Sequence, residues 1–169
     1  LQFPTGRHAT MMEAGKSHTC AVMDNNDLIC WGDNSKGQLG LGDTDHRGDA
    51  AGEIGNNFAV TSVPNGRSVD SMALGWDHTC VVWDNYSVSC WGGNDNGQLG
   101  LDSTTDIGDG AGEMGDNLDF LDLPGTASAI TAGDGFTCAI VDDNGNDRAF
   151  CWGLNDYGQL GIESTTNVE

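Results

Sequence analysis

Short stretches of the chain alternate between two sets of side chains with period two, and this pattern predicts β-strands. Residues 18–23 read His-Thr-Cys-Ala-Val-Met and residues 78–83 read His-Thr-Cys-Val-Val-Trp, so both faces of each strand are largely apolar. Such strands suit sheets that are covered on two sides, and helical periodicity is absent. Further strands are expected at Arg7–Ala14, Ser68–Leu74 and Ala127–Ala132.

One block of sequence recurs three times. Each copy carries Thr-Cys, then a second Cys followed by Trp-Gly, then Gly-Gln-Leu-Gly, and the copies occupy residues 17–41, 77–101 and 136–162. Self-similarity at a nearly fixed period predicts a repeat architecture. We expect repeat 1 at residues 1–60, repeat 2 at 61–120 and an incomplete repeat 3 at 121–169.

The repeats predict an all-β fold. About four short strands in each ~60-residue repeat suit tandem antiparallel, four-stranded β-propeller blades, with a stacked solenoid of sheets as the competing geometry. The chain opens at a repeat start and stops inside a repeat. We therefore expect about three blades in one propeller-type domain segment, either open or part of a larger or assembled propeller.

The six cysteines occur as one pair in each repeat, and their spacing predicts three hairpins. If the partners face one another across antiparallel strands, the turn centres fall on Asn25, on Asn85 and between Asn144 and Gly145. Asn-Gly strongly favours a two-residue hairpin turn, and directly opposed strand residues lie within disulfide range. The predicted disulfides are Cys20–Cys30, Cys80–Cys90 and Cys138–Cys151.

Disulfides also indicate a compartment. The competing zinc interpretation needs cysteines two to four residues apart, and the sequence contains no such pair. Disulfides persist in oxidising surroundings, so we expect an extracellular, secreted chain. The sequon Asn85-Tyr86-Ser87 lies on the predicted tip of the second hairpin, which makes Asn85 a candidate glycosylation site.

The His-Thr-Cys, Cys-Trp-Gly and Gly-Gln-Leu-Gly elements closely resemble the regulator of chromosome condensation repeat family, over nearly the whole chain. The resemblance implies blades of a β-propeller, usually seven-bladed, and the Cys before Trp-Gly resembles its extracellular, cysteine-paired branch. The family prototype is a nuclear exchange factor that also binds nucleosomes, and no interaction loop of that protein is matched here. The resemblance therefore implies a fold and, for function, an interaction surface.

The charge of the chain excludes some partners. Six Lys and Arg against 26 Asp and Glu give a net charge of −20, which opposes binding to nucleic acid or to an anionic membrane. No apolar stretch approaches the roughly 18 residues of a membrane span. The acidic surface is interpreted mainly as an aid to solubility, with cation binding as the alternative.

No recognisable catalytic motif is present, so we expect a non-enzyme. His18 and His78 are repeat equivalents, but Phe136 replaces them in the third copy, which favours a packing role. The recurring tryptophans favour core packing over sugar stacking, whereas Trp76 and Trp83 are unrepeated candidates for a specific surface or interface. The recurring set is Trp31, Trp91 and Trp152.

Two acidic loop segments, residues 43–53 and 102–113, are the best ligand candidates. Carboxylates and Gly carbonyls on a turning loop suit Ca²⁺, although EF-hand spacing is missing and ordinary solvated loops are the competing interpretation. No other cofactor is expected. The candidate calcium ligands are Asp43, Asp49, Glu53, Asp109 and Glu113.

These features favour a non-enzymatic extracellular structural or protein-interaction module. It would be a segment of a larger secreted or surface repeat protein, or of a self-assembling fibre. Exposed sheet edges and apolar faces make self-association or docking of neighbouring repeats the expected partnership. The alternatives are a Ca²⁺- or carbohydrate-binding module that takes a glycan, and a non-catalytic propeller attached to a secreted hydrolase.

Overall fold

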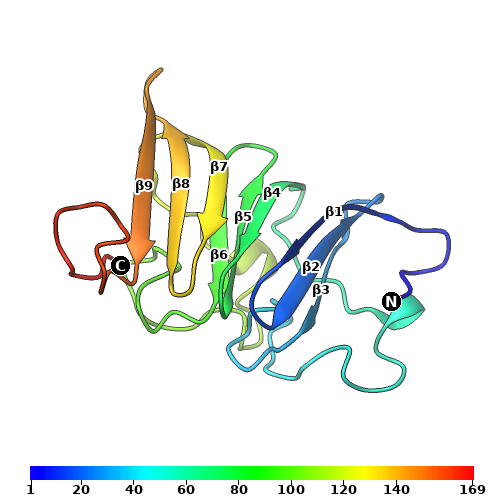
Figure 1. Cartoon of the computed structure of the whole chain (residues 1–169). Helices are drawn as coiled ribbons and strands as arrows, with labels where there is room; N and C mark the ends of the chain where they lie inside the picture. Colours follow the sequence, from blue (N-terminus) through cyan, green and yellow to red (C-terminus); the bar gives the residue numbers. More distant parts are fainter.

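The computed structural model describes residues 1–169 and consists of three antiparallel sheets of three strands each (Figure 1). The sheets stand side by side in chain order, one in each predicted repeat, and the termini lie at opposite ends of the row. This arrangement confirms the all-β fold with about three repeats. The strands are β1 (Ala9–Ala14), β2 (His18–Met23), β3 (Leu28–Gly32), β4 (Val69–Leu74), β5 (His78–Trp83), β6 (Val88–Gly92), β7 (Thr126–Ala132), β8 (Phe136–Asp142) and β9 (Asp147–Gly153), with short 3-10 helices η1 (Gly55–Asn57) and η2 (Gly115–Asn117).

The expected fourth strand of each blade is missing. After β3 the chain turns at Gly37 and Gly40, which have φ angles of +77° and +65°. It then returns to the first sheet only through isolated bridges, such as the one between Ile29 and Val60. Positive φ values are incompatible with an extended strand, so this segment forms a long loop in place of a paired outer strand.

Each hairpin has the turn that its cysteine spacing requires. In the first, Met23 N donates to Asp27 O at 2.9 Å, which leaves a three-residue loop centred on Asn25. The third hairpin pairs Asp142 with Asp147 and turns through Asn144 and Gly145, which have φ angles of +56° and +85°. Both central residues of a type I′ turn need positive φ, and Asn-Gly tolerates this at little cost.

Three disulfides link the second and third strands of the sheets, at Cys20–Cys30, Cys80–Cys90 and Cys138–Cys151. The Cα atoms of each pair are 4.1 Å apart. The four cysteines of the first two pairs are at most 1% exposed, whereas Cys138 and Cys151 are only half-buried.

Most of the core lies in two seams, which we define as the interfaces between successive sheets. A smaller cluster on the outer side of the first sheet joins Ala21, Met23 and Ile29 to Phe58. In the first seam, apolar residues of β2 and β3 pack against Val81, Trp83 and Trp91 of the second sheet. In the second seam, Val82 and Val88 of the second sheet belong to one apolar cluster with residues of β7, β8 and β9. Every sheet therefore depends on its neighbour to remove apolar surface from water.

Trp83 corrects one expectation. Its side chain is 0% exposed, packs in the first seam and donates Nε1–H to Ser89 Oγ at 3.0 Å. It occupies the strand position of Met23 in repeat 1, where the residue is also buried. Trp83 is therefore a core residue and offers no surface to a partner.

The difference in burial predicts the order in which the disulfides are reduced. A mild thiol reductant should open Cys138–Cys151 first, because a disulfide must be accessible to the attacking thiolate. Alkylation followed by peptide mass mapping would follow this order. Full reduction should lower the free energy of unfolding, measured with urea, by about 3 kcal/mol per disulfide, since each bond constrains the unfolded chain. Simultaneous loss of all three bonds, or earlier loss of a buried one, would contradict the predicted order.

Candidate functional site

The first seam is joined by hydrogen bonds that converge on one backbone carbonyl. Gln38 O, from the Gly-Gln-Leu-Gly segment of repeat 1, accepts from Thr79 Oγ1 at 2.9 Å and from Trp91 Nε1 at 3.1 Å. The same Thr79 hydroxyl lies 2.9 Å from Nε2 of His18. Residues of all three repeated elements thus meet at a single point between two sheets.

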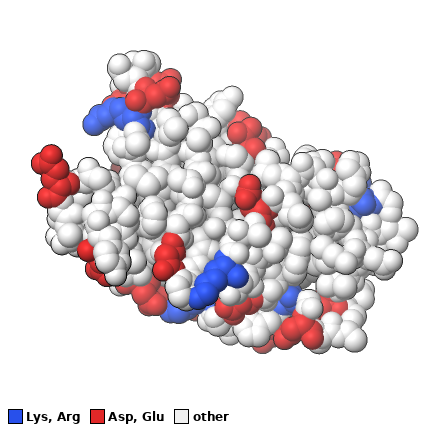
Figure 2. All heavy atoms as spheres, in the orientation of Figure 1, with Lys and Arg blue, Asp and Glu red and all other residues white.

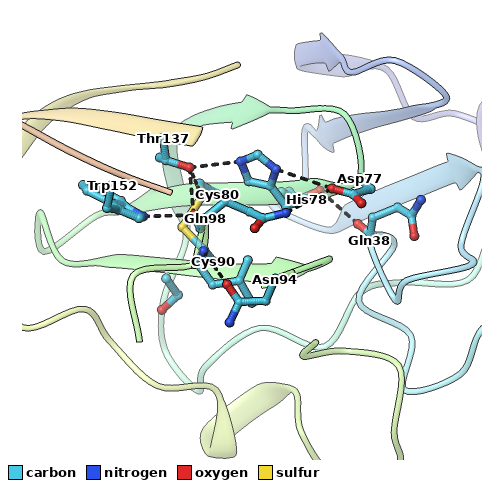
Figure 3. The surroundings of a disulfide bond; sticks show 12 residues. Gln38, Asp77, His78, Cys80, Cys90, Asn94, Gln98, Thr137 and Trp152 are labelled. Atoms are coloured by element: carbon cyan, nitrogen blue, oxygen red, sulfur yellow. Dashed lines mark hydrogen bonds and ion pairs between the residues drawn. A yellow bond between two sulfur atoms is a disulfide. The ribbon is translucent and has the colours of Figure 1, made fainter. Parts of the chain in front are cut away.

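The second seam repeats this geometry (Figure 3). Gln98 O accepts from Thr137 Oγ1 and from Trp152 Nε1, both at 2.9 Å, while His78 Nε2 lies 3.0 Å from Thr137 Oγ1. The disulfide sulfur of Cys80 lies 3.8 Å from the same hydroxyl. We call this arrangement the seam network, and it recurs because the residues that form it recur.

The hydrogen bonds of the Thr hydroxyls determine which ring nitrogen of each histidine carries the proton. Each Thr hydroxyl uses its proton on the Gln carbonyl, so it accepts from the Nε2–H of the histidine. Nδ1 of His18 and of His78 has no hydrogen-bond partner. Burial lowers the pKa of both histidines to about 4, so both are neutral at pH 7. The geometry gives them a packing role, as Phe136 in the third copy indicates.

A buried asparagine organises the loop after each third strand. Asn94 Oδ1 accepts from Leu99 N at 3.0 Å, while its Nδ2 donates to Ser103 O and Thr105 O at 2.8 and 3.0 Å. The equivalent residues Asn34 and Asn155 make corresponding bonds and are 0% exposed. Sequence reasoning missed this asparagine, although it stands three residues before Gly-Gln-Leu-Gly in every copy.

The candidate calcium ligands are engaged with the protein itself. Glu53 accepts from the backbone N–H groups of Gly48 and Ala50, and Glu113 accepts from Gly108 and Gly110. These bonds to the charged form lower the pKa of Glu53.

Among the aspartates of the same loops, Asp43 pairs with Arg47 at 2.7 Å. Burial, followed by the charge of Glu113, raises the pKa of Asp109. Within residues 1–169, no three or more His, Cys, Asp or Glu side chains are grouped to hold a metal ion. Calcium binding stays a prediction.

The recurring tryptophans differ in exposure. Trp91 and Trp152 are 0% and 5% exposed and belong to the seam network, so neither ring is open for stacking on a sugar. Trp31 is half-buried and packs against Phe58 and Phe3, with ring centroids 5.5 and 6.4 Å away. Trp76 is 46% exposed and lines two surface hollows, in agreement with its interpretation as a surface residue.

The two ends of the row of sheets present different faces. The outer face of the third sheet carries an apolar groove of about 240 Å³, formed mainly by Ala, Ile and Thr side chains of β7 and β8, and Ile140 in it is 44% exposed. Its repeat equivalents, Val22 and Val82, are 4% and 0% exposed because a following sheet covers them. At the other end, Trp31 and Thr19 of the first sheet occupy the positions that donate to a Gln carbonyl in both seams.

Asn85 lies where the sequence places it, at the exposed tip of the second hairpin. Its Oδ1 accepts from Ser87 Oγ at 2.7 Å and from Ser87 N at 3.3 Å.

The acidic side chains visible in Figure 2 are spread in separate groups over the face of the molecule shown there, with a few basic groups among them. No helix of the chain is long and apolar enough to cross a membrane.

Comparison with known proteins places these repeats. The profile described as "Regulator of chromosome condensation (RCC1) repeat" matches residues 12–38 and 127–159. The X-linked retinitis pigmentosa GTPase regulator of Mus musculus is 33% identical over 157 residues, which are 93% of this chain and 14% of the relative. The ultraviolet-B receptor of Arabidopsis thaliana is 32% identical over 166 residues, 96% of this chain and 33% of the relative.

Solved structures share the fold. The crystal structure of yeast RCC1 superposes with a TM-score of 0.75 at 18% identity, covering 96% of this chain and 36% of that one. The crystal structure of human WBSCR16 gives a TM-score of 0.70 at 21% identity, covering 95% of this chain and 38% of that one. This chain therefore spans well under half the length of the relatives it matches.

The seam network predicts a strong effect of Thr79→Val. The change leaves the buried His18 Nε2–H without an acceptor and removes one donor from Gln38 O, which should cost about 1–3 kcal/mol in urea unfolding. The matched control is Thr19→Val, because Thr19 occupies the same strand position and makes no such bond. The control should stay within about 0.5 kcal/mol of the parent. Equal losses in both variants would contradict the role given to the network.

The buried histidines predict a loss of stability in mild acid. Their folded-state pKa of about 4 lies below the ordinary value of 6.5, so the unfolded chain binds more protons between these values. The stability that the two neutral histidines contribute is fully present above pH 6.5. As the pH falls toward 4, the free energy of unfolding decreases by up to about 3 kcal/mol per histidine. Urea unfolding between pH 7 and pH 5 would measure the slope before most carboxylates titrate.

The variant His78→Phe, which copies the third repeat, should reduce that slope. His8→Ala is the control, since His8 is exposed and its removal should leave the slope unchanged. A slope that is the same in all three proteins would rule out the histidines as its cause.

Proposed function

Because this chain belongs to the regulator of chromosome condensation (RCC1) repeat family, whose propellers are protein-interaction modules, we propose that it is a non-enzymatic, extracellular module that binds protein. Its binding surfaces are the two outer faces of the row of sheets. The partners are neighbouring repeats or a second copy of the chain. The module would serve in a larger secreted or surface repeat protein.

The observation that carries the proposal is the complementarity of the two outer faces. At each seam, we call the sheet that comes first in the chain the leading sheet and the next one the following sheet. The leading sheet supplies a Gln carbonyl and apolar strand residues, and the following sheet supplies a Thr hydroxyl and a Trp Nε1–H. The third sheet presents Gln159 and the apolar groove around Ile140, and the first sheet has Thr19 and Trp31, both half-buried, at the donor positions. Phe3 and Phe58 already pack against the apolar side chains of that first face, so the match between the two ends lies in the Thr and Trp donors and the Gln carbonyl.

The same complementarity makes the association head-to-tail. A sheet that leads at one interface cannot follow at the same interface, so contact between copies would be heterologous rather than two-fold. Such contacts either close a ring or continue into a fibre. The Phe136 side chain lacks the donor of His18 and His78, so this interface would have one hydrogen bond fewer than the internal seams.

Three disulfides and the position of Asn85 support the extracellular assignment. All six cysteines are paired, and disulfides persist mainly in oxidising compartments. Asn85 is exposed at a hairpin tip, a position at which a glycan can be attached. The curated relatives are not named as extracellular proteins, so the compartment depends on the chemistry of this chain alone.

Association can be tested by sedimentation velocity over a wide concentration range. The parent should show concentration-dependent assembly, and Ile140→Asp should abolish it by placing a charge in the apolar groove. Phe120→Asp is the matched control, because Phe120 is 46% exposed, against 44% for Ile140, and lies outside the groove. A parent that stays monomeric at all concentrations, or an equal effect of both substitutions, would refute association through the outer face.

The compartment can be tested separately on material secreted by eukaryotic cells. Alkylation before reduction should modify no cysteine, and Asn85→Gln should remove any mass that a peptide N-glycosidase releases. Native material with six alkylated thiols would contradict the extracellular assignment.

A further inference from the structure

The turns that join the first two strands of the sheets lie side by side and form one rim of the molecule. Lys16 N donates to Gly75 O and Trp76 N donates to Asp134 O, each at 3.3 Å. We call residues 14–17, 74–77 and 132–135 the turn rim. Lys16, Trp76 and Asp134 occupy the same repeat position along it, so the chain itself offers a comparison between the two seams.

At the first seam, two lysines of the chain occupy this region. The ammonium group of Lys16 lies over the ring of Trp76. Lys36 Nζ lies 3.1 Å from Asp95 Oδ2 and 3.0 Å from Asp106 Oδ2. The hydrogen bonds to these two carboxylates raise the pKa of Lys36.

At the second seam, both lysines are replaced and acidic groups are added. Trp76 stands where repeat 1 has Lys16, and Asn96 stands where it has Lys36. Asp77 and Asp95 replace Ser17 and Ser35, and Asp134 stands in the third repeat at the position of Trp76. The second seam therefore keeps an aromatic ring and gains carboxylates, while its own repeat supplies no lysine at these positions. The lysines of repeat 1 reach its edge, with Lys16 over Trp76 and Lys36 paired with Asp95.

A cavity of about 170 Å³ opens at this place. Its walls include the exposed ring of Trp76, the half-buried Asp77 and the fully buried Gln98, whose Nε2 lies 3.4 Å from Asp77 Oδ1. Burial raises the pKa of Asp77, as do the charges of Asp106 and Asp95, whereas the hydrogen bond from Gln98 and the charge of Lys36 lower it. Lys36 pairs with Asp95, but Asp77 and Asp134 make no ion pair with a lysine or arginine side chain.

We propose that this cavity binds an alkylammonium group, presented as a lysine side chain by a partner protein. An aromatic ring flanked by carboxylates attracts an organic cation, and here the ring is that of Trp76 and the carboxylates without a lysine or arginine partner are Asp77 and Asp134. Lysine is the side chain that the equivalent region of the first seam contains. The site lies on the turn rim, away from the outer faces, so it can bind even if those faces do not.

Isothermal titration of the 169-residue chain with N-acetyl-lysine N-methylamide tests the proposal, with n-butylammonium as the minimal cation and n-butanol as the neutral probe. We expect both cations to bind saturably and butanol to show no binding. Asp134→Asn should weaken the binding about two- to fivefold, as loss of one partly exposed charge partner does. Asp134 is exposed, so this variant should fold normally.

A second variant tests the comparison between seams. Asn96→Lys restores the residue of repeat 1 and should abolish binding, because the protein then supplies its own ammonium group. Asp119→Asn is the charge-matched control, since Asp119 is exposed and lies outside the cavity, and its affinity should equal that of the parent.

The proposal is overturned if neither cation binds saturably, or if Asp134→Asn and Asn96→Lys bind as the parent does. Displacement of the bound cation by one equivalent of Ca²⁺ would also overturn it, because the cavity would then be a metal site. Tighter binding of the lysine derivative than of n-butylammonium supports a protein ligand over a free amine, and the reverse order would refute the lysine source.

Discussion

The structure depends on how the backbone carbonyl of a glutamine is satisfied between sheets. Gln38 O and Gln98 O each accept two hydrogen bonds from the following sheet, one from a Thr hydroxyl and one from a Trp ring. A buried carbonyl without partners costs several times what a single bond contributes, so these donors fix the position of one sheet against the next. The apolar seam supplies most of the driving force, but it is not directional. The hydrogen bonds supply the direction.

This constraint explains which residues recur. The carbonyl reaches the seam only because the loop turns tightly, and Gly37 has a positive φ and no room for a side chain, since a Cβ there would lie 2.4 Å from Asp109 N. The buried Asn34 holds the loop in that shape. The histidine is needed less, because it donates to a hydroxyl that already has its own acceptor. Phe136 can therefore replace it in the third repeat at the cost of one hydrogen bond.

The sequence allowed the local structure to be predicted further than the environment of individual side chains. Because strand residues alternate with period two, the cysteine spacing determined the hairpin register and the turn at Asn144 and Gly145. The missing fourth strand and the burial of Trp83 depend on how distant segments meet, which spacing does not encode. Trp76 was identified because it breaks the repeat, but its acidic neighbours Asp95 and Asp134 come from other loops and are brought to it only by the assembly of the sheets. The Asn network was missed for a different reason, since its residues recur in every copy but an asparagine in a loop usually indicates only a turn.

All three disulfides join cysteines that are 10 or 13 residues apart, within one hairpin. No covalent bond other than the backbone therefore connects one sheet to the next. Under tension between its two ends, the sheets would separate at the seams and the long loops between them would extend. Each hairpin would stay closed because its disulfide links the two strands. The confinement of each disulfide to one repeat also matters for evolution. A duplicated repeat contains both cysteines of its disulfide and needs no partner cysteine elsewhere in the chain. An array of this kind can lengthen one unit at a time without ever passing through a state with an unpaired thiol.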